Sequence, residues 1–349
     1  MSSSPYDVFL TGTVFLDIVM TGFGAEPRPG TEVFTTGMGS CPGGIANLAV
    51  AASRLGLRTC LAAAFGDDVY GDFCWRTLTE DEGVDLSRSR RFDGWHSPVT
   101  LSLAVDGDRT MVTHMHDAPV LEDELVGTPP PARAAITYLS AEPHPWHDLA
   151  RGQGTLLFAD VGWDPSQRWS AALLDQLERC HAFMPNDVEA MAYTRTEDAG
   201  TALRRLADRV PVATVTSGSA GSRGIDSTTG EEAWVPAVPV TAQDATGAGD
   251  VFDTAFALGT LGGWRLADRL AFANLCAGLS VQHVGGSLAA PGWGDIADWW
   301  AAVRRRGRGS DAATAKLCRR YGFLDEVLPA GSPRTVRRAS ATLARRSDA

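Results

Sequence analysis

The chain has 349 residues, of which 44% are hydrophobic, and its 31 lysine and arginine residues against 42 acidic residues give a formal net charge of −11. This length allows one large domain or two smaller ones, with a sizeable core in either case. Its only lysine is Lys316, which excludes a Walker-A loop, a Schiff-base lysine and a protein-kinase strand lysine anywhere before that position. Phosphate chemistry on this chain would have to rely on backbone amides, arginine or a metal.

Charge is distributed unevenly, because residues 304–349 hold 12 basic and 4 acidic residues and leave the rest with a net charge of −19. Such an acidic body is not expected to bind nucleic acid, since neutralising phosphates needs clustered cations. The six cysteines are scattered without CxxC spacing, which indicates reduced thiols in a cytoplasmic protein. No signal peptide is expected from the N-terminal sequence, and no apolar run approaches the roughly 20 residues of a membrane span.

Short β-prone runs alternate with helical patterns along the chain, which predicts an α/β fold with a mostly parallel central sheet flanked by helices. The predicted strands of this sheet are 7–14, 59–65, 135–139, 155–160, 182–184 and 212–216. The predicted helices are 45–55, 70–82, 170–179, 200–209, 248–261 and 266–283.

Two segments interrupt this alternation. Residues 31–36 form a short β-prone run, and residues 99–105 and 110–116 alternate with period two around Asp106-Gly107-Asp108, a pattern typical of a hairpin. Together they predict a small antiparallel sheet outside the main one, from about residues 20–38 and 97–117. Such a sheet could act as a lid over a site.

The basic tail differs in composition from the rest of the chain. Apolar residues recur at helical spacing through Leu317, Tyr321 and Leu324, which predicts one amphipathic helix, about 311–321, packed on the acidic body. The last 16 residues are expected to be mobile. A contact of this tail with nucleic acid or a partner is the less favoured alternative.

The most informative motif is Asp244-Ala-Thr-Gly-Ala-Gly-Asp250, which precedes an apolar helical pattern. A glycine-rich turn that opens a helix presents unpaired backbone N–H groups, and the helix dipole adds positive potential there. Such a turn can bind an anion without any lysine. Taken alone, however, Asp250 could simply cap the helix.

This segment resembles the C-terminal signature of the PfkB/ribokinase family of small-molecule kinases, usually D-T-x-G-A-G-D, with Ala245 in place of the usual threonine. The resemblance implies a ribokinase-like fold in which Asp250 is the catalytic base. The amides of Gly247, Ala248 and Gly249 would then receive the transferring phosphate. The resemblance covers about residues 5–302, which would form the kinase domain, and residues 303–349 would be a basic C-terminal extension.

Motifs near the N-terminus fit the substrate side of that family. Gly12 followed by Asp17 matches a strand-end aspartate that binds a substrate hydroxyl. Asp17 lies on or just after the first predicted strand and is expected at the ligand edge of the parallel sheet. Gly43-Gly44-Ile-Ala-Asn47 matches the G-G-x-x-N substrate motif. Asp160 ends a predicted strand, where the family often has an aspartate close to substrate or phosphate. The segment GWDPSQRW that follows Asp160 differs from the sequence that the family usually has there.

Later motifs fit the nucleotide side. Asn186-Asp-Val-Glu189 matches N-x-x-E, which implies that Glu189 holds Mg²⁺ through a bound water, in keeping with the hydration that Mg²⁺ retains. Thr216, Gly218 and Gly221 match the V-T-x-G-x-x-G nucleotide loop. Without the other motifs, a surface Asn–Glu pair and an ordinary strand-to-turn glycine loop would be the better interpretations.

Three more positions have counterparts in the family. Asn274 falls where the family places residues near the adenine, and Asp244 and Thr246 resemble its monovalent-cation site. The implied cofactors are therefore ATP and Mg²⁺, with K⁺ as an option that the sequence leaves open.

The sequence thus predicts an ATP-dependent kinase that phosphorylates an alcohol of a sugar or sugar-like molecule. A nucleoside kinase of the same family is the alternative, and an aromatic residue stacked on a base would distinguish it; the candidates are Phe15, Phe34, Trp95 and Trp163. A non-catalytic sugar- or nucleotide-binding regulator is an alternative from a different class. The expected partners are ATP and the small substrate, a homodimer through the lid is compatible with this interpretation, and no membrane partner is expected.

The histidines give weaker signals. His114 and His116 could face one side of a lid strand, towards substrate or a metal, although a solvated edge pair is the favoured interpretation because two ligands do not make a zinc site. His144 and His147 also lack a third ligand. The sequence contains no dinucleotide-binding fingerprint, no HExxH and no GxSxG.

Overall fold

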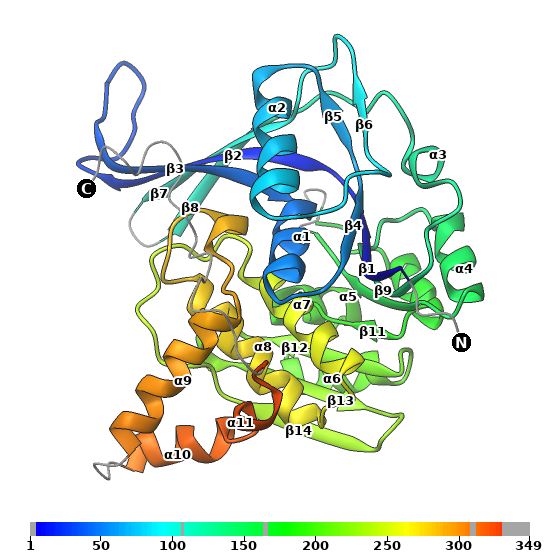
Figure 1. Cartoon of the computed structure of the whole chain (residues 1–349), viewed down its shortest axis with the longest axis vertical. Helices are drawn as coiled ribbons and strands as arrows, with labels where there is room; N and C mark the ends of the chain where they lie inside the picture. Colours follow the sequence, from blue (N-terminus) through cyan, green and yellow to red (C-terminus); the bar gives the residue numbers. More distant parts are fainter. Residues whose placement is uncertain (1–4, 106–107, 163–166, 308–311, 330–349) are drawn as a thin grey trace.

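The computed structural model describes residues 5–105, 108–162, 167–307 and 312–329 (Figure 1). In these residues the largest sheet has eight strands in the order β14-β13-β12-β11-β10-β9-β1-β4. Pairing is parallel from β12 to β4, and β13 and β14 extend the sheet in antiparallel fashion. The strands are β1 (Tyr6–Thr11), β4 (Thr59–Ala62), β9 (Ala132–Tyr138), β10 (Leu156–Asp160), β11 (Ala182–Phe183), β12 (Val212–Thr216), β13 (Ser222–Asp226) and β14 (Glu231–Val235).

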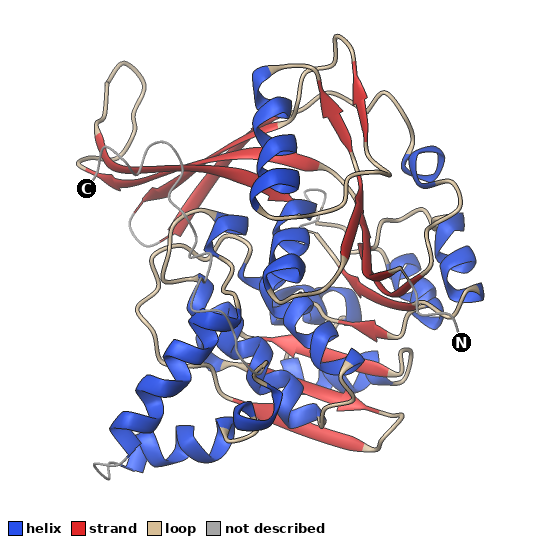
Figure 2. Ribbon diagram, viewed as in Figure 1, coloured by secondary structure: helices blue, strands red, loops and turns tan. Residues whose placement is uncertain are grey.

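Helices cover both faces of this sheet (Figure 2). Along β1, Val8 and Leu10 point into the core shared with α1, α7 and α8, while Phe9 points into the core shared with α4, α5 and α6. This three-layer arrangement confirms the predicted α/β fold. The helices are α1 (Ile45–Arg54), α2 (Val69–Arg76), α3 (Glu122–Val126), α4 (Pro145–Gly152), α5 (Asp187–Thr194), α6 (Ala199–Ala207), α7 (Ala248–Leu261), α8 (Leu266–Ser280), α9 (Trp293–Gly307), α10 (Ala312–Tyr321) and α11 (Leu324–Val327).

A second sheet projects sideways from the body, as Figure 1 shows, and we call it the lid. Within the described residues it has four strands in the order β3-β2-β7-β8. These strands are β2 (Val14–Phe23), β3 (Thr35–Gly44), β7 (Val99–Val105) and β8 (Asp108–His114). The predicted lid is therefore present, but it is mixed rather than antiparallel, because β2 and β7 pair in parallel.

Several predicted boundaries are wrong. The strand expected over 7–14 is two strands in different sheets, separated at Gly12, whose φ of 151° few other residues adopt. The β-prone run 31–36 is not extended before β3 begins at Thr35, and Asp106 and Gly107 of the hairpin lie outside the described residues. The strand expected over 59–65 divides into β4 and β5 (Ala64–Gly66), and β5 pairs with β6 (Arg90–Phe92).

Further differences concern helical segments, and helix α9 was not predicted. The helix predicted over 70–82 is α2 followed by the π-turn η1 (Thr77–Asp81), and the one predicted over 170–179 is the 3₁₀ segment η2 (Ala171–Arg179). Two further 3₁₀ turns are η3 (Gly218–Ala220) and η4 (Gly286–Ala289). The antiparallel strands β13 and β14 were not predicted.

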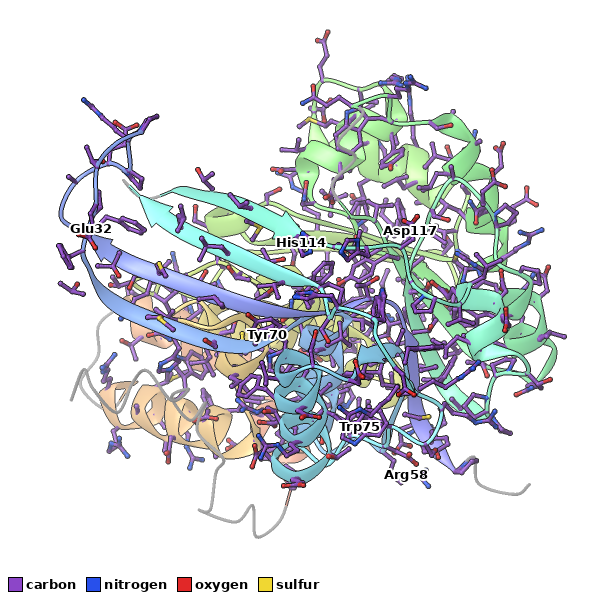
Figure 3. The ribbon with its side chains drawn as sticks, turned by 90° about the horizontal axis from the view of Figure 1, so that it is seen from above. Glu32, Arg58, Tyr70, Trp75, His114 and Asp117 are labelled. Carbon is purple, nitrogen blue, oxygen red and sulfur yellow. The ribbon has the colours of Figure 1, made fainter. Side chains whose placement is uncertain are left out.

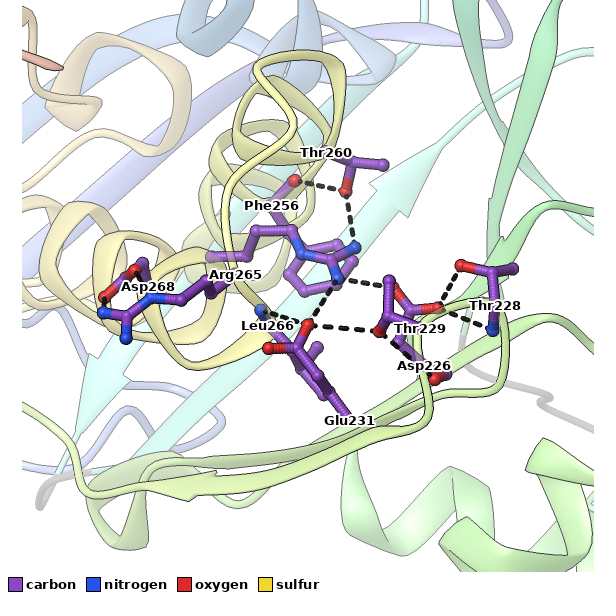
Figure 4. A network of polar contacts seen from close by, with 10 residues as sticks. Asp226, Thr228, Thr229, Glu231, Phe256, Thr260, Arg265, Leu266 and Asp268 are labelled. Atoms are coloured by element: carbon purple, nitrogen blue, oxygen red, sulfur yellow. Dashed lines mark hydrogen bonds and ion pairs between the residues drawn. The ribbon is translucent and has the colours of Figure 1, made fainter.

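The antiparallel end of the sheet is fastened to α8 by a buried arginine. The side chain of Arg269 forms an ion pair with Asp226 of β13, and both side chains are almost fully buried (Figure 4). Arg269 Nη1 also donates to Thr260 Oγ1 at 3.4 Å. Removing one partner of such a pair would leave an unpaired buried charge, so this contact fixes how the sheet end meets the helices.

The described part of the C-terminal extension includes two helices, α10 and α11, where one was predicted. Tyr321, the last residue of α10, and Leu324, the first of α11, are fully buried in the main hydrophobic cluster. Arg320 Nη1 donates to the carbonyl oxygen of Pro236 at 3.0 Å. Residues 330–349 lie outside the described residues, so the prediction about the end of the tail is not tested. Among the described helices, none has the length and apolar character needed to cross a bilayer.

Candidate active site

The motif residues gather at the carboxyl edge of the parallel strands, where ligands bind in open α/β sheets. Gly12 follows β1 there, and Asp160 and Thr216 end β10 and β12. Gly247 caps the N-terminus of α7 in the left-handed conformation, with φ of 73°. Gly249 is exposed, and a Cβ added there would meet no heavy atom within 4 Å. Open space therefore lies in front of the first turn of α7, where an anion could approach the helix amides.

Asp250 lies in that first turn and is held by two donors from distant parts of the chain. Asn47 Nδ2 of α1 donates to Asp250 Oδ2 at 2.8 Å. The hydroxyl of Tyr138, the last residue of β9, donates to Asp250 Oδ1. Asp250 is therefore held as an acceptor at the helix start rather than serving as a simple cap. Tyr138 was not found from the sequence.

Asp17 is buried on β2 of the lid, not at the edge of the main sheet as predicted. It pairs in register with Cys41 of β3 and Thr100 of β7. Gly43 gives its carboxylate room, because a Cβ at position 43 would overlap the Asp17 side chain. Gly44, at φ of 61°, then caps α1, the helix that carries Asn47. The G-G-x-x-N motif thus connects the lid aspartate to the Asp250 site.

A buried group of carboxyls lies beside Asp250. Burial, together with the Glu189 carboxylate, raises the pKa of Asp160 well above its usual range. Burial and the adjacent Asp160 raise the pKa of Asp253 in the same way, and the two carboxyls share a hydrogen bond. Burial also raises the pKa of Glu189. Asp253 was not singled out from the sequence, because within an apolar helix nothing marks it as near Asp160.

The predicted nucleotide residues meet at the neighbouring strand ends. Asn186 and Glu189 form a capping box at the start of α5, with Asn186 Oδ1 accepting from Glu189 N at 2.9 Å and Glu189 Oε2 from Asn186 N at 3.0 Å. Asn186 also bridges Thr216 of β12. Gly218 and Gly221 follow with φ of 50° and 95°, and a Cβ at Gly221 would collide with the backbone around Val235.

Asn274, Asp244 and Thr246 have local partners in the protein. The buried Asn274 amide donates to Val235 O at 2.9 Å, so this side chain supports the strand end behind Gly221. Asp244 accepts from Thr246 N at 2.9 Å, from Thr246 Oγ1 at 2.6 Å and from Gly285 N at 3.1 Å. These bonds fasten the loop before α7, and a cation at this loop stays a prediction.

A cavity of about 490 Å³ lies beside Tyr138, the partner of Asp250. Three aromatic side chains, Phe15, Trp95 and Tyr138, line it together with aliphatic residues. Among the described lining residues there is no lysine or arginine, whereas Asp117 and Glu122 are present. Of the four candidate stacking aromatics, the cavity therefore includes Phe15 and Trp95. Phe34 is 77% exposed away from it, and Trp163 lies outside the described residues.

The lid histidines form a row where the lid meets the body. Figure 3 shows His114 at that end and Glu32 near the opposite end. The ring centroids of His96 and His114 are 5.2 Å apart, and those of His114 and His116 are 4.9 Å apart. His144 instead contacts Asp123, with 3.1 Å between Nδ1 and Oδ2. In the part of the chain that the structure describes, no three His, Cys, Asp or Glu side chains are placed to hold a metal. All six cysteines are free thiols, as predicted.

Curated relatives of this chain are sugar and nucleoside kinases. A fructokinase from Klebsiella pneumoniae is 30% identical over 285 residues, which cover 72% of this chain and 89% of the relative. A nucleoside kinase from Methanothermobacter thermautotrophicus is 27% identical over 282 residues, which cover 77% of this chain and 87% of the relative.

Solved structures share the fold at lower identity. The ribokinase of Arabidopsis thaliana complexed with ribose and ATP is 22% identical and has a TM-score of 0.66, with 82% of this chain and 96% of that chain covered. An Escherichia coli protein in complex with ATP and Mg²⁺ is 19% identical and has a TM-score of 0.69, with 81% and 95% covered. These likenesses confirm the predicted ribokinase-like fold.

The family model described as pfkB family carbohydrate kinase matches residues 26–292, which is well over half of the chain. That range contains the glycine pair before Asn47, the Asn186–Glu189 box and the α7 start with Asp250. The chain belongs to the pfkB family of carbohydrate kinases.

Proposed function

We propose that this protein is an ATP-dependent kinase that transfers the γ-phosphoryl group to a hydroxyl of a small sugar-like acceptor. The observation that carries the proposal is the fixed carboxylate of Asp250 at the open N-terminus of α7, held by Asn47 and Tyr138. A base and an anion-binding helix end at one place are what phosphoryl transfer to an alcohol requires.

The proposed reaction uses three parts of this edge. Asp17 and the segment Gly43–Asn47 would bind the acceptor hydroxyls. As the acceptor oxygen bonds to the γ-phosphorus and the bond to the departing ADP oxygen breaks, Asp250 takes the acceptor proton. The amides of Gly247, Ala248 and Gly249 stabilise the negative charge on the transferring group.

The residues at the other strand ends fit ATP and Mg²⁺. Gly221 packs so closely on the backbone of Val235 and Pro236 that a Cβ would collide with it, so the path of the loop proposed to hold the nucleotide depends on glycine at this position. Three carboxyl side chains, Glu189, Asp160 and Asp253, gather at this corner, and carboxyl oxygens are the ligands that a hard divalent cation prefers. In this proposal Mg²⁺ would be held mainly by phosphates and waters, one of them on Glu189. When bound, the cation supplies charge neutralisation on the phosphates.

A nucleoside acceptor is the second candidate, and the cavity favours it. The cavity presents Phe15, Trp95 and aliphatic side chains next to polar ones that include His116 and Asp117. Such a surface would bury the face of a purine or pyrimidine. The ribose hydroxyls would still be bound by Asp17 and Asn47.

A panel of acceptors tests the proposal. ADP release is measured with Mg²⁺–ATP and either neutral sugars or nucleosides, in parallel for the wild type and for Asp175→Asn, a control that neutralises an exposed carboxylate. The kinase proposal predicts acceptor-stimulated ADP release and a phosphorylated product with both proteins. A regulator without catalysis predicts binding with no stimulation by any acceptor, and that result would refute the proposal. A preference for nucleosides that Trp95→Ala abolishes would select the second candidate.

A further inference from the structure

Tyr138 joins the cavity to the proposed base. Its ring lines the cavity, and its hydroxyl donates to Asp250 Oδ1. Asn47 donates to the other carboxylate oxygen, so both oxygens of Asp250 accept from side chains, and these two donors come from β9 and α1. Two donors from separate elements fix both the position and the plane of the carboxylate.

The phenol comes from a rigid part of the fold. Strand β9 lies between β1 and β10 in the main sheet, and Tyr138 pairs in register with Asp160. The next residue, Leu139, donates its N–H to Asp160 O at 2.8 Å. The hydroxyl is thus delivered by a hydrogen-bonded strand and not by a mobile loop, which is the support that a precisely placed group needs.

Carboxyl side chains surround Asp250, so a hydrogen bond from a neutral donor stabilises its carboxylate without adding another acidic group. Asp160 of β10 and Asp253 of α7 face this group, and Glu189 of α5 lies beyond them. Burial and the Asp250 carboxylate raise the pKa of Tyr138 well above its usual range, so the phenol keeps its proton and can only donate to a charged Asp250.

We propose that Tyr138 is a positioning residue for phosphoryl transfer, whose hydroxyl orients the Asp250 carboxylate and keeps it ready to accept the acceptor proton. This inference rests on the proposed function. It assigns Tyr138 a role through Asp250 and not through a bond of its own to the acceptor, and that distinction can be measured.

Tyr138→Phe removes only the hydroxyl and keeps the ring that lines the cavity. We expect kcat to fall about 10- to 100-fold, the range that corresponds to a hydrogen bond to a charged group, while the KM for the acceptor stays within about threefold. The matched control is Tyr6→Phe, which also removes a phenol that donates to an aspartate, Tyr6 to Asp85 at 2.6 Å, but at the opposite end of β1. Tyr6→Phe should leave kcat unchanged, and thermal melting of both variants shows whether the fold is kept.

The double variant Tyr138→Phe with Asp250→Asn distinguishes positioning from mere structural support. If Tyr138 acts through Asp250, Tyr138→Phe should cost little further kcat once Asp250 is asparagine. An equal loss of kcat in both backgrounds would overturn the proposal, because Tyr138 would then act independently of the base. Wild-type kcat in the single variant would overturn it as well.

These outcomes separate the two proposals. If no acceptor stimulates ADP release by the wild type, the proposed function fails. If Asp250→Asn keeps wild-type turnover, the assignment of Asp250 as the base fails, and the role of Tyr138 fails with it. If Asp250→Asn loses turnover and Tyr138→Phe does not, only the role of Tyr138 fails.

Discussion

Asn47 and Asp250 lie 203 positions apart in the sequence, and their side chains are joined by a hydrogen bond of 2.8 Å between Nδ2 and Oδ2. The bond connects the start of α1, which follows the lid, to the start of α7, which faces the open space for the phosphate. Asn47 is 5% exposed, and Gly247 leaves it room, since a Cβ there would lie 3.1 Å from Asn47 Cγ. The substrate motif and the catalytic signature therefore form one site.

Replacing this donor by an acceptor should disable the site. Asn47→Asp is nearly the same size but places a second carboxylate against Asp250, so the two groups repel each other or share a proton. We expect kcat to fall at least about 100-fold, the usual contribution of a general base, and the melting temperature to fall as well, because a second buried carboxyl is costly. Steady-state kinetics at neutral pH measure this, and turnover close to wild type would show that Asp250 does not depend on Asn47.

Gly43 should control acceptor binding through Asp17. A methyl group at position 43 overlaps the Asp17 carboxylate and must displace it. We expect Gly43→Ala to raise the KM for the acceptor at least about tenfold, the effect of losing one hydrogen bond to a charged group, while the KM for ATP changes little. Gly152→Ala, at the end of α4 with nothing within 4 Å of the added Cβ, is the matched control. Equal KM values for the two variants would mean that Asp17 does not bind the acceptor.

Gly218 and Gly221 allow a paired test of the nucleotide loop. Both have positive φ, but a Cβ at Gly218 meets nothing within 4 Å, whereas a Cβ at Gly221 collides with the backbone at Val235 and Pro236. Gly221→Ala should therefore weaken ATP binding much more than Gly218→Ala, whose cost is conformational strain alone. Titration with a nucleotide analogue measures both affinities, and a larger loss for Gly218→Ala would show that the tight approach at Gly221 is not needed for ATP.

The pair of carboxyls Asp160 and Asp253 should make stability depend on pH. Burial raises the pKa of Asp253 in the folded protein above its ordinary value of 3.8, so the unfolded chain loses this proton at a lower pH than the folded protein does. Stability then decreases as pH rises above about 3.8, until the folded pKa is reached. Asp253→Asn removes the contribution of Asp253 to the pH dependence of stability. The asparagine amide can still donate a hydrogen bond to Asp160.

Melting curves from pH 4.5 to pH 8 check this prediction. We expect the melting temperature of Asp253→Asn to equal or exceed that of the wild type at pH 8, with a difference that shrinks towards pH 4.5. If the melting temperature of Asp253→Asn, measured against the wild type, were lower at pH 8 than at pH 4.5, the pKa of Asp253 would not be raised in the folded protein.

Much of the site could be predicted because its residues lie in local patterns. Thr216, Asp160 and the α7 turn each follow or end a recognisable strand or precede a helix, and strands that run in parallel bring their carboxyl ends to one edge. The α7 and β12 boundaries were predicted to the residue. The sequence order of the motifs then indicated which edge residues belong together.

Other features depend on contacts that no local pattern carries. Tyr138 looks like an ordinary strand end until β9 is placed beside α7, and Asp253 is one polar residue in an apolar helix. Asp17 was placed in the wrong sheet because the break at Gly12 separates two apolar runs that read as one strand. Contacts between elements far apart in the sequence place all three residues, and such contacts leave no pattern in a single short segment.

The most direct test of the central claim is the turnover of Asp250→Asn with its best acceptor. This substitution keeps the size of the side chain and removes its capacity to accept a proton from the acceptor. The measurement is the rate of transfer of the γ-phosphoryl group to the acceptor, with circular dichroism as the control for folding. We expect a loss of at least about 100-fold in kcat with the fold retained. Turnover within about threefold of the wild type would contradict the assignment of Asp250 as the base.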